Sequence, residues 1–176
     1  MKQPRFSIIT PTYNRKSLIS RLWNSLKNQT FQDFEWIVID DGSTDGTYDY
    51  LLSVKGNNIK IFRFDENKGI NSAYNKGLEL AGGDYILFIG SDDIYLPTSL
   101  ETFINIWEKV DHSIGVIGTR CLELETGNKI GKLEGKEILL SYEDIVCSKK
   151  FKNGDLDLCF RAEIIKEERF PEDILA

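Results

Sequence analysis

The sequence has little cysteine and almost no histidine. Three of its 176 residues are cysteine and one is histidine. Cys121, Cys147 and Cys159 are odd in number and show no CxxC spacing, and a chain of this length does not need a disulfide framework, so a reducing compartment is expected. His112 follows an amphipathic segment and is expected at the surface, so neither a catalytic triad nor a histidine-rich zinc site is indicated.

A long apolar run and an excess of positive charge are also missing. No stretch approaches the roughly 18 apolar residues of a membrane span, and residues 1–5 lead into the first apolar segment without a secretory apolar block. Lys and Arg number 22 against 28 Asp and Glu, a net charge of -6. This is the wrong sign for holding a polyanionic backbone. We therefore expect a cytoplasmic protein with no transmembrane segment and no nucleic-acid partner.

The sequence lacks the common nucleotide-binding fingerprints. No G-x-G-x-x-G follows the first apolar segment, and no G-x-x-x-x-G-K-[ST] occurs, which excludes the dinucleotide and P-loop patterns. Residues 41–46 resemble the opening of a calcium loop, but Leu52 stands where the bidentate glutamate is required. A calcium sensor is not indicated.

Short apolar runs alternate with amphipathic segments, the pattern of repeated βαβ units. With 41% hydrophobic and 28% charged residues, the chain is expected to form one soluble α/β domain whose mostly parallel sheet is flanked by helices. Strands are expected at residues 6–9, 36–39, 59–64, 85–89 and 115–119, helices at 18–26, 48–52, 69–80 and 98–107, and a hairpin at 122–133.

Several residues are expected to begin or end these helices. Asn14 or Ser17 would cap the first helix, and Thr98 with Glu101 has the spacing of a capping box. The Gly82-Gly83 pair would stop the third helix. Ser141 and Asp144 would open a further short helix, and residues 163–166 have a helical pattern.

Polar residues follow three of the expected strands. Because ligands bind at the carboxyl ends of parallel strands, these residues are candidates for one site. Each alone could be a turn or a cap. Asp92 and Asp93 follow a buried apolar run and suit Mg²⁺ or Mn²⁺ bound together with substrate phosphates, although capping of the next helix would explain one of them. The candidates are Thr12, Tyr13, Asn14, Arg15, Asp40, Asp41, Ser91, Asp92 and Asp93.

Three motifs in order resemble the family 2 glycosyltransferases with the GT-A fold. They are PTYNR at 11–15, IDDGSTDGT at 39–47 and ENKGINSAYNKGLELAGGDYILFIGSDDIYLP at 66–97. The resemblance covers roughly residues 5–110 and implies a Rossmann-like, mostly parallel sheet. It implies a metal-dependent, inverting transfer of a sugar from a nucleotide donor, usually a UDP-sugar, to an acceptor hydroxyl.

The resemblance also implies the setting of the reaction. The cofactor would be Mn²⁺ or Mg²⁺, and the enzyme would be of the hexosyltransferase type, acting in surface polysaccharide or glycan synthesis. The partners would be the nucleotide-sugar donor and a glycan or lipid-linked acceptor. A cytoplasmic location would then extend to peripheral contact at the inner face of the membrane.

Individual residues match the motifs of the family. Tyr13 would flank the base, with backbone contacts from Pro11 and Thr12, and Asp41 and Asp40 would bind base and ribose. Lys68 would meet the diphosphate, Asp92 would be the last acid of the DxD motif, preceded by Ser91, and Asp93 would be the acid that often follows. Gly90 replaces the leading acid of DxD and Tyr74 replaces a common arginine, for which Lys68 or Arg15 would compensate. The donor-site residues implied are Pro11, Thr12, Tyr13, Arg15, Asp40, Asp41, Lys68, Ser91 and Asp92, and the metal ligands are Asp92 and Asp93.

The catalytic base is expected in the C-terminal part. Glu172 and Asp173 are candidates because residues 169–173 resemble the segment near the base, although surface acids are an equally good interpretation. Residues 1–176 would form one domain, with a donor-binding half at 1–110 and the start of an acceptor-side half at 111–176. We expect a chain that ends here to lack, or barely reach, its base. A non-catalytic nucleotide-sugar binding module is the alternative, and a nucleotidyltransferase would need a Gly-rich basic loop where PTYNR stands.

Overall fold

The computed structural model describes residues 3–54, 56–129 and 156–172. Two compact units form, one from residues 1–117 and 159–176 and the other from residues 118–158. The expected helix at Ser141 and Asp144 lies outside the described residues, as do Cys147 and Asp173. The larger unit contains all the candidate site residues that are described.

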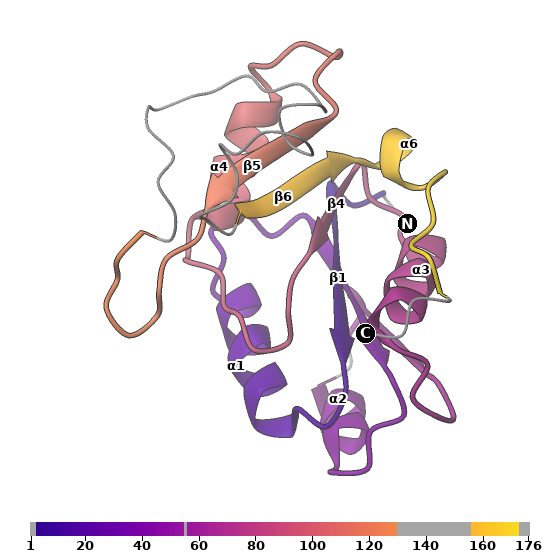
Figure 1. Cartoon of the computed structure of the whole chain (residues 1–176). Helices are drawn as coiled ribbons and strands as arrows, with labels where there is room; N and C mark the ends of the chain where they lie inside the picture. The colour runs from indigo at the N-terminus through magenta and orange to yellow at the C-terminus, as the bar shows by residue number, and fades with distance from the viewer. Residues whose placement is uncertain (1–2, 55, 130–155, 173–176) are drawn as a thin grey trace. The chain divides into compact units, whose positions relative to one another are not determined.

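A six-stranded sheet forms the centre of the fold, with the strand order β3-β2-β1-β4-β6-β5 (Figure 1). β1 pairs in parallel with β2 and β4, β2 pairs in parallel with β3, and β4 pairs antiparallel with β6. The predicted α/β class with a mostly parallel sheet is confirmed. The strands are β1 (Phe6–Thr12), β2 (Phe34–Asp40), β3 (Ile59–Arg63), β4 (Tyr85–Phe88), β5 (Val116–Arg120) and β6 (Leu156–Arg161).

Helices cover both faces of the sheet, which explains why its strands are apolar on both sides. Trp36 and Phe6 belong to a core shared with α1 and α4, whereas Ile9 and Ile37 belong to a core shared with α3. Trp36 donates from Nε1 to Oγ1 of Thr10 over 3.0 Å and stacks on Trp23. The helices are α1 (Lys16–Lys27), α2 (Thr47–Val54), α3 (Ile70–Leu80), α4 (Ser99–Trp107) and α6 (Ala162–Ile165).

The expected helix signals are only partly confirmed. Thr98 precedes α4, but its side chain makes no capping bond, and Glu101 accepts from Oγ1 of Thr30 over 2.8 Å. The capping-box prediction is therefore wrong, because a hydroxyl from another element binds the glutamate. α3 ends at Leu80 with an extended Ala81, before the glycine pair. The short helix expected at 163–166 is present as α6.

The segment after β5 contains the turn expected from Thr126-Gly127-Asn128. Leu122 and Lys129 form an antiparallel bridge, and Gly127 has a φ of 68°. The rest of the expected hairpin, residues 130–133, lies outside the described residues. Across the parts of the chain that the structure describes, no helix combines the length and the apolar character that a membrane crossing requires.

Candidate functional site

The loops that follow β1 and β2 are joined at the carboxyl edge of the sheet. The N–H of Asn14 donates to Oγ of Ser43 over 2.9 Å, and the N–H of Thr44 donates to Oδ1 of Asn14 over 2.8 Å. Asn14 has a φ of 53°, a left-handed conformation that asparagine tolerates better than most residues. These bonds fix the backbone beside Tyr13, a residue that is 45% exposed.

The start of α1 receives its caps from the loop after β2 and from the first residue of α2. The N–H of Arg15 donates to Oγ1 of Thr47 over 3.1 Å, and the N–H of Lys16 donates to Oδ2 of Asp45 over 3.2 Å. No side chain of the N-cap position itself makes a capping bond, so the prediction for Asn14 or Ser17 is wrong. A carboxylate distant in sequence satisfies the orphan N–H instead. Arg15 is thereby held at the site edge.

Asp40 is buried beneath these loops. Its Oδ1 accepts from the N–H of Ser43 over 3.3 Å, and its Oδ2 lies 3.4 Å from Nε of Arg63. The residue is 0% exposed, and burial raises the pKa of its carboxyl above the usual value. Within the described residues, Oδ2 of Asp40 and Oγ1 of its register partner Thr12 have no hydrogen-bond partner. The position of Asp40 supports the loop; its contact with a ligand stays a prediction.

Burial of Asp40 predicts a pH-dependent stability. Because its folded pKa is raised above 3.8, its contribution to folding is fully present below pH 3.8 and is lost as the pH rises through the folded pKa. Asp40→Asn keeps an oxygen that can accept from the N–H of Ser43, but it cannot ionise. The part of the free energy of unfolding that the native chain loses as the pH rises through the folded pKa of Asp40 should therefore not be lost in this variant. Urea unfolding at a series of pH values measures it, with exposed Asp65→Asn as control. An identical pH slope in Asp40→Asn and the native chain would contradict the prediction.

Asp41 joins the end of β2 to the turn before α3. Its Oδ1 accepts from the N–H of Lys68 over 2.7 Å and its Oδ2 from the N–H of Gly69 over 2.9 Å. The residue is only 4% exposed, and its own N–H donates to the carbonyl of Thr12 over 2.8 Å. A carboxylate here also faces the positive end of the α3 dipole. The ends of β1 and β2 and the turn before α3 are thus connected through one residue, by its backbone N–H and its carboxylate.

Asp92 and Asp93 converge over Gly90 after β4. A Cβ built on Gly90 would lie 2.8 Å from Oδ2 of Asp93 and 2.9 Å from Oδ1 of Asp92. Nη1 of Arg15 lies 3.4 Å from Oδ2 of Asp92, whose side chain is 57% exposed. The absence of a side chain at residue 90 therefore leaves the space between the two carboxylates open.

The chemistry of this acid pair suits a hard divalent cation. Carboxylate oxygens are the ligands that Mg²⁺ and Mn²⁺ prefer, and such ions commonly take one or two carboxylates together with substrate phosphates. No group of three or more His, Cys, Asp or Glu that could hold a metal occurs in the described ranges. Asp92 and Asp93 fit a site that a bound phosphate completes.

Tyr74 lies beside the acid pair, on α3. Its ring packs against Phe88 with centroids 5.0 Å apart and against Phe170 at 5.2 Å. Burial, together with the charge of Asp93, raises the pKa of the Tyr74 hydroxyl. Tyr74 therefore supplies aromatic packing at this position and no positive charge.

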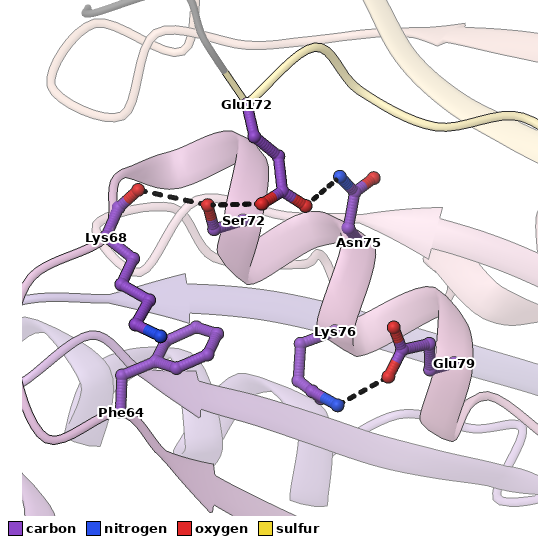
Figure 2. A pocket seen from close by; sticks show the side chains of 7 residues that line it. All are labelled: Phe64, Lys68, Ser72, Asn75, Lys76, Glu79 and Glu172. Carbon is purple, nitrogen blue, oxygen red and sulfur yellow. Dashed lines mark hydrogen bonds and ion pairs between the residues drawn. The ribbon is translucent and has the colours of Figure 1, made fainter.

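Glu172 is bound to α3, in a small pocket of about 200 Å³ (Figure 2). Its carboxylate accepts from Oγ of Ser72 over 3.2 Å and from Nδ2 of Asn75 over 2.7 Å. Asn75 also binds the backbone of Phe170, donating to its carbonyl and accepting from its N–H. Sequence reasoning missed Ser72 and Asn75, because nothing in their local pattern indicates a contact with a segment about 100 residues later.

The predicted site residues fall into two groups. Lys68 and Glu172 line the pocket on α3, where the Lys68 ammonium lies 5.1 Å from the Phe64 ring centroid. The second group lies at the carboxyl ends of β1, β2 and β4, and Asp41 joins it to the backbone of Lys68. This second group comprises Pro11, Thr12, Tyr13, Arg15, Asp40, Asp41, Ser91, Asp92 and Asp93.

Two curated bacterial proteins are similar to most of this chain. One is the GalNAc(5)-diNAcBac-PP-undecaprenol beta-1,3-glucosyltransferase of Campylobacter jejuni, 29% identical over 97% of this chain and 56% of its own length. The other is the putative teichuronic acid biosynthesis glycosyltransferase TuaG of Bacillus subtilis, 32% identical over 81% of this chain and 57% of its own length. The chain thus spans a little over half the length of these two relatives.

Solved structures show the same architecture. S. aureus TarS 1-349 in complex with UDP-GlcNAc superposes with a TM-score of 0.76 and 27% identity, over 95% of this chain and 48% of that one. The mannosyltransferase PcManGT from Pyrobaculum calidifontis, in complex with GDP-Man and Mn²⁺, gives a TM-score of 0.67 at 21% identity, over 99% and 49%. The latter likeness shows the GT-A fold alone.

A family model matches most of the chain, and it agrees with the resemblance of the three motifs. The model for glycosyl transferase family 2 matches residues 7–162, from the second residue of β1 through the end of β6, and so includes the joined loops. On this match the chain belongs to glycosyl transferase family 2 and has its GT-A fold.

Proposed function

We propose that the chain binds a nucleotide-sugar, with UDP as the nucleotide, for inverting transfer of the sugar to an acceptor hydroxyl. The observation that carries the proposal is the convergence of Asp92 and Asp93 over Gly90, next to the loop with Tyr13 and Arg15. Family membership and the likeness to a TarS structure that holds UDP-GlcNAc support it. Residues 1–110 would form the donor half, and residue 111 would begin the acceptor side.

The joined loops suit the two ends of such a donor. The half-exposed ring of Tyr13 offers a face for the base, and the fixed backbone at Pro11 and Thr12 lies beside it. The guanidinium of Arg15 lies at the acid pair, where it can meet a diphosphate. Lys68 supplies a further cation on the neighbouring turn, and Asp41 orders that turn.

Asp92 and Asp93 would hold the divalent cation. When bound, the cation supplies neutralisation of the charge that develops on the departing diphosphate. The carboxylates of Asp92 and Asp93 lie side by side. The positive charge of Arg15 beside Asp92 reduces the repulsion between them before a donor binds. Gly90 keeps the space between them free of a side chain.

Glu172 and Asp173 are our candidates for the base. A base must come within hydrogen-bond reach of the acceptor hydroxyl. Each carboxylate oxygen of Glu172 accepts one hydrogen bond, from Ser72 or from Asn75, and keeps a lone pair that could accept the proton of a hydroxyl. The alternative is a nucleotide-sugar binding module without transfer, in which these two bonds serve to hold residues 170–172 on α3. Release of UDP from a UDP-sugar separates the two functions, since a module binds the donor without releasing UDP.

The relatives support a proposal for the acceptor and the setting. We propose a glycan or lipid-linked acceptor, in bacterial surface polysaccharide synthesis at the cytoplasmic side of a membrane. The named acceptor of the Campylobacter relative, an undecaprenyl-diphosphate glycan, and the teichuronic acid assignment of TuaG support this class. An assay of sugar transfer to lipid-linked glycans in detergent tests this proposal.

Titration calorimetry with UDP tests the donor site and its cation. UDP should bind the native chain more tightly in Mn²⁺ than in EDTA, and Asp92→Asn should reduce this Mn²⁺-dependent gain by about tenfold, the effect of roughly 1.4 kcal/mol. Asp84→Asn is the matched control, since Asp84 is a half-exposed acid at the opposite end of β4 and pairs with Arg5. Equal UDP affinity in Mn²⁺ and EDTA would refute the metal-dependent site.

A further inference from the structure

The segment that carries the acid pair is anchored to the far end of α1. After β4, the chain leaves the carboxyl edge of the sheet and returns along α1 to the start of α4 (Figure 1). On this return, the N–H of Tyr95 donates to Oγ of Ser25 over 3.1 Å. The N–H of Thr30 donates to the carbonyl of Pro97 over 2.8 Å. The end of α1 therefore holds residues 95–97.

One buried side chain makes the principal contact. The amide of Gln29 donates from Nε2 to the carbonyl of Leu96 over 2.7 Å and to that of Ser25 over 3.2 Å. Its Oε1 accepts from the N–H of Leu100 over 3.1 Å, in the first turn of α4. Gln29 is only 4% exposed. Its amide thus links α1, the returning segment and α4.

The start of α4 depends on this amide. Thr98 makes no capping bond with its side chain, so the N–H of Leu100 is satisfied by Gln29. An orphan N–H in the first turn of a helix needs such a partner when it is buried. Removal of the Gln29 amide would free both the returning segment and the beginning of α4.

The other end of α1 contacts the acid pair itself. Arg15 immediately precedes α1 and pairs with Asp92, while Gln29 lies two residues after α1. We infer that Gln29 is a positioning residue for Asp92 and Asp93, which orders their loop before a cation and a diphosphate bind. The inference rests on the proposed function, because it concerns the metal-dependent part of that binding.

Loss of the Gln29 amide is expected to affect only the part of UDP binding that depends on Mn²⁺. A loop that must be ordered during binding lowers affinity by the free energy of that ordering. The loops with Tyr13 and Asp41 are held by bonds to one another and to the turn before α3, and Gln29 makes none of these bonds. Loss of the amide should therefore weaken the effect of Mn²⁺ and leave UDP binding in EDTA unchanged.

The experiment compares UDP binding in Mn²⁺ and in EDTA for Gln29→Met, which keeps the length of the side chain without its hydrogen bonds. The ratio of the two dissociation constants should fall roughly tenfold, with the EDTA value unchanged. Gln32→Met is the matched control, because the Gln32 amide donates to the backbone carbonyls of Lys27 and Gln29 and not to the returning segment or α4 within the described residues. A purely structural role would shift the melting temperature and both constants together.

Each outcome decides the inference. The inference is overturned if Gln29→Met keeps the native ratio of the two dissociation constants. It is also overturned if the variant loses UDP affinity equally in Mn²⁺ and in EDTA. In both cases the proposed donor site stands. A native chain without any Mn²⁺ effect overturns the metal-dependent function and the inference together. If Gln29→Met does not fold, Thr30→Val decides, because it removes only the hydroxyl bonds of Thr30 to Glu101 and Pro97. Its ratio should fall roughly threefold, and an unchanged ratio overturns the inference.

Discussion

Replacing Asp41 by alanine is expected to lower the free energy of unfolding by about 3 kcal/mol, since two charge-assisted hydrogen bonds are lost. Both oxygens of Asp41 are occupied, by the N–H groups of Lys68 and Gly69, and the side chain is buried. The turn before α3 would lose its attachment to β2. UDP affinity should fall by roughly a hundredfold, because that turn carries Lys68 and joins the other loops. Urea unfolding and UDP calorimetry measure the two effects.

Two further variants make this result specific. Asp41→Asn keeps one acceptor oxygen and should lose about half of the stability that Asp41→Ala loses. Asp65→Ala is the control, because Asp65 is an exposed acid between β3 and α3. A native stability in Asp41→Ala, with normal UDP binding, would show that the turn does not depend on this carboxylate.

Substitution of Gly83 by valine is expected to be the most damaging change to the fold. A Cβ at Gly83 would lie 2.6 Å from the backbone N of Ser7 and 2.8 Å from the carbonyl carbon of Phe6. These atoms belong to β1, which pairs with β4 through Phe6 and Tyr85. The strand cannot yield without losing this pairing, so a loss of about 3 kcal/mol or more in unfolding free energy is expected.

The neighbouring glycine provides the comparison. A Cβ at Gly82 would meet only side-chain atoms, the nearest being Oε1 of Glu35 at 3.3 Å. Gly82→Ala should therefore cost about 1 kcal/mol or less. Thermal unfolding followed by circular dichroism distinguishes the two variants. Equal melting temperatures for Gly83→Val and the native chain would mean that β1 and β4 separate more easily than their register indicates.

The sequence predicts the fold well where local pattern and tertiary structure agree. The apolar runs at β1, β2 and β4 are buried on both faces, so their composition alone indicates strands of a covered parallel sheet. The same logic places Tyr13 and Asp92 at one edge, because carboxyl ends of parallel strands coincide. Family motifs add roles for these residues that the spacing alone does not give.

Contacts between distant segments set the limit of that prediction. Asp45 caps α1, Gln29 caps the beginning of α4, and Asn75 binds the backbone of Phe170. In each case a polar side chain satisfies backbone groups far away in sequence, and no local pattern records the partner. Gly83 is a similar case. The sequence indicates a helix stop at this residue, but it does not indicate that the backbone of β1 lies too close for a side chain there.

The position of β6 has a consequence for how the chain folds while a ribosome makes it. β6 pairs with β4, yet roughly 70 residues separate the two strands, and their synthesis takes about 4 to 14 seconds at roughly 5–20 residues per second. During that interval β1 to β4 can already pair, and the apolar edge of β4 at Ile86 and Leu87 is open to solvent. The nascent protein therefore passes through a stage in which the edge of β4 can accept a strand from another chain. Pairing of β6 with β4 ends this stage.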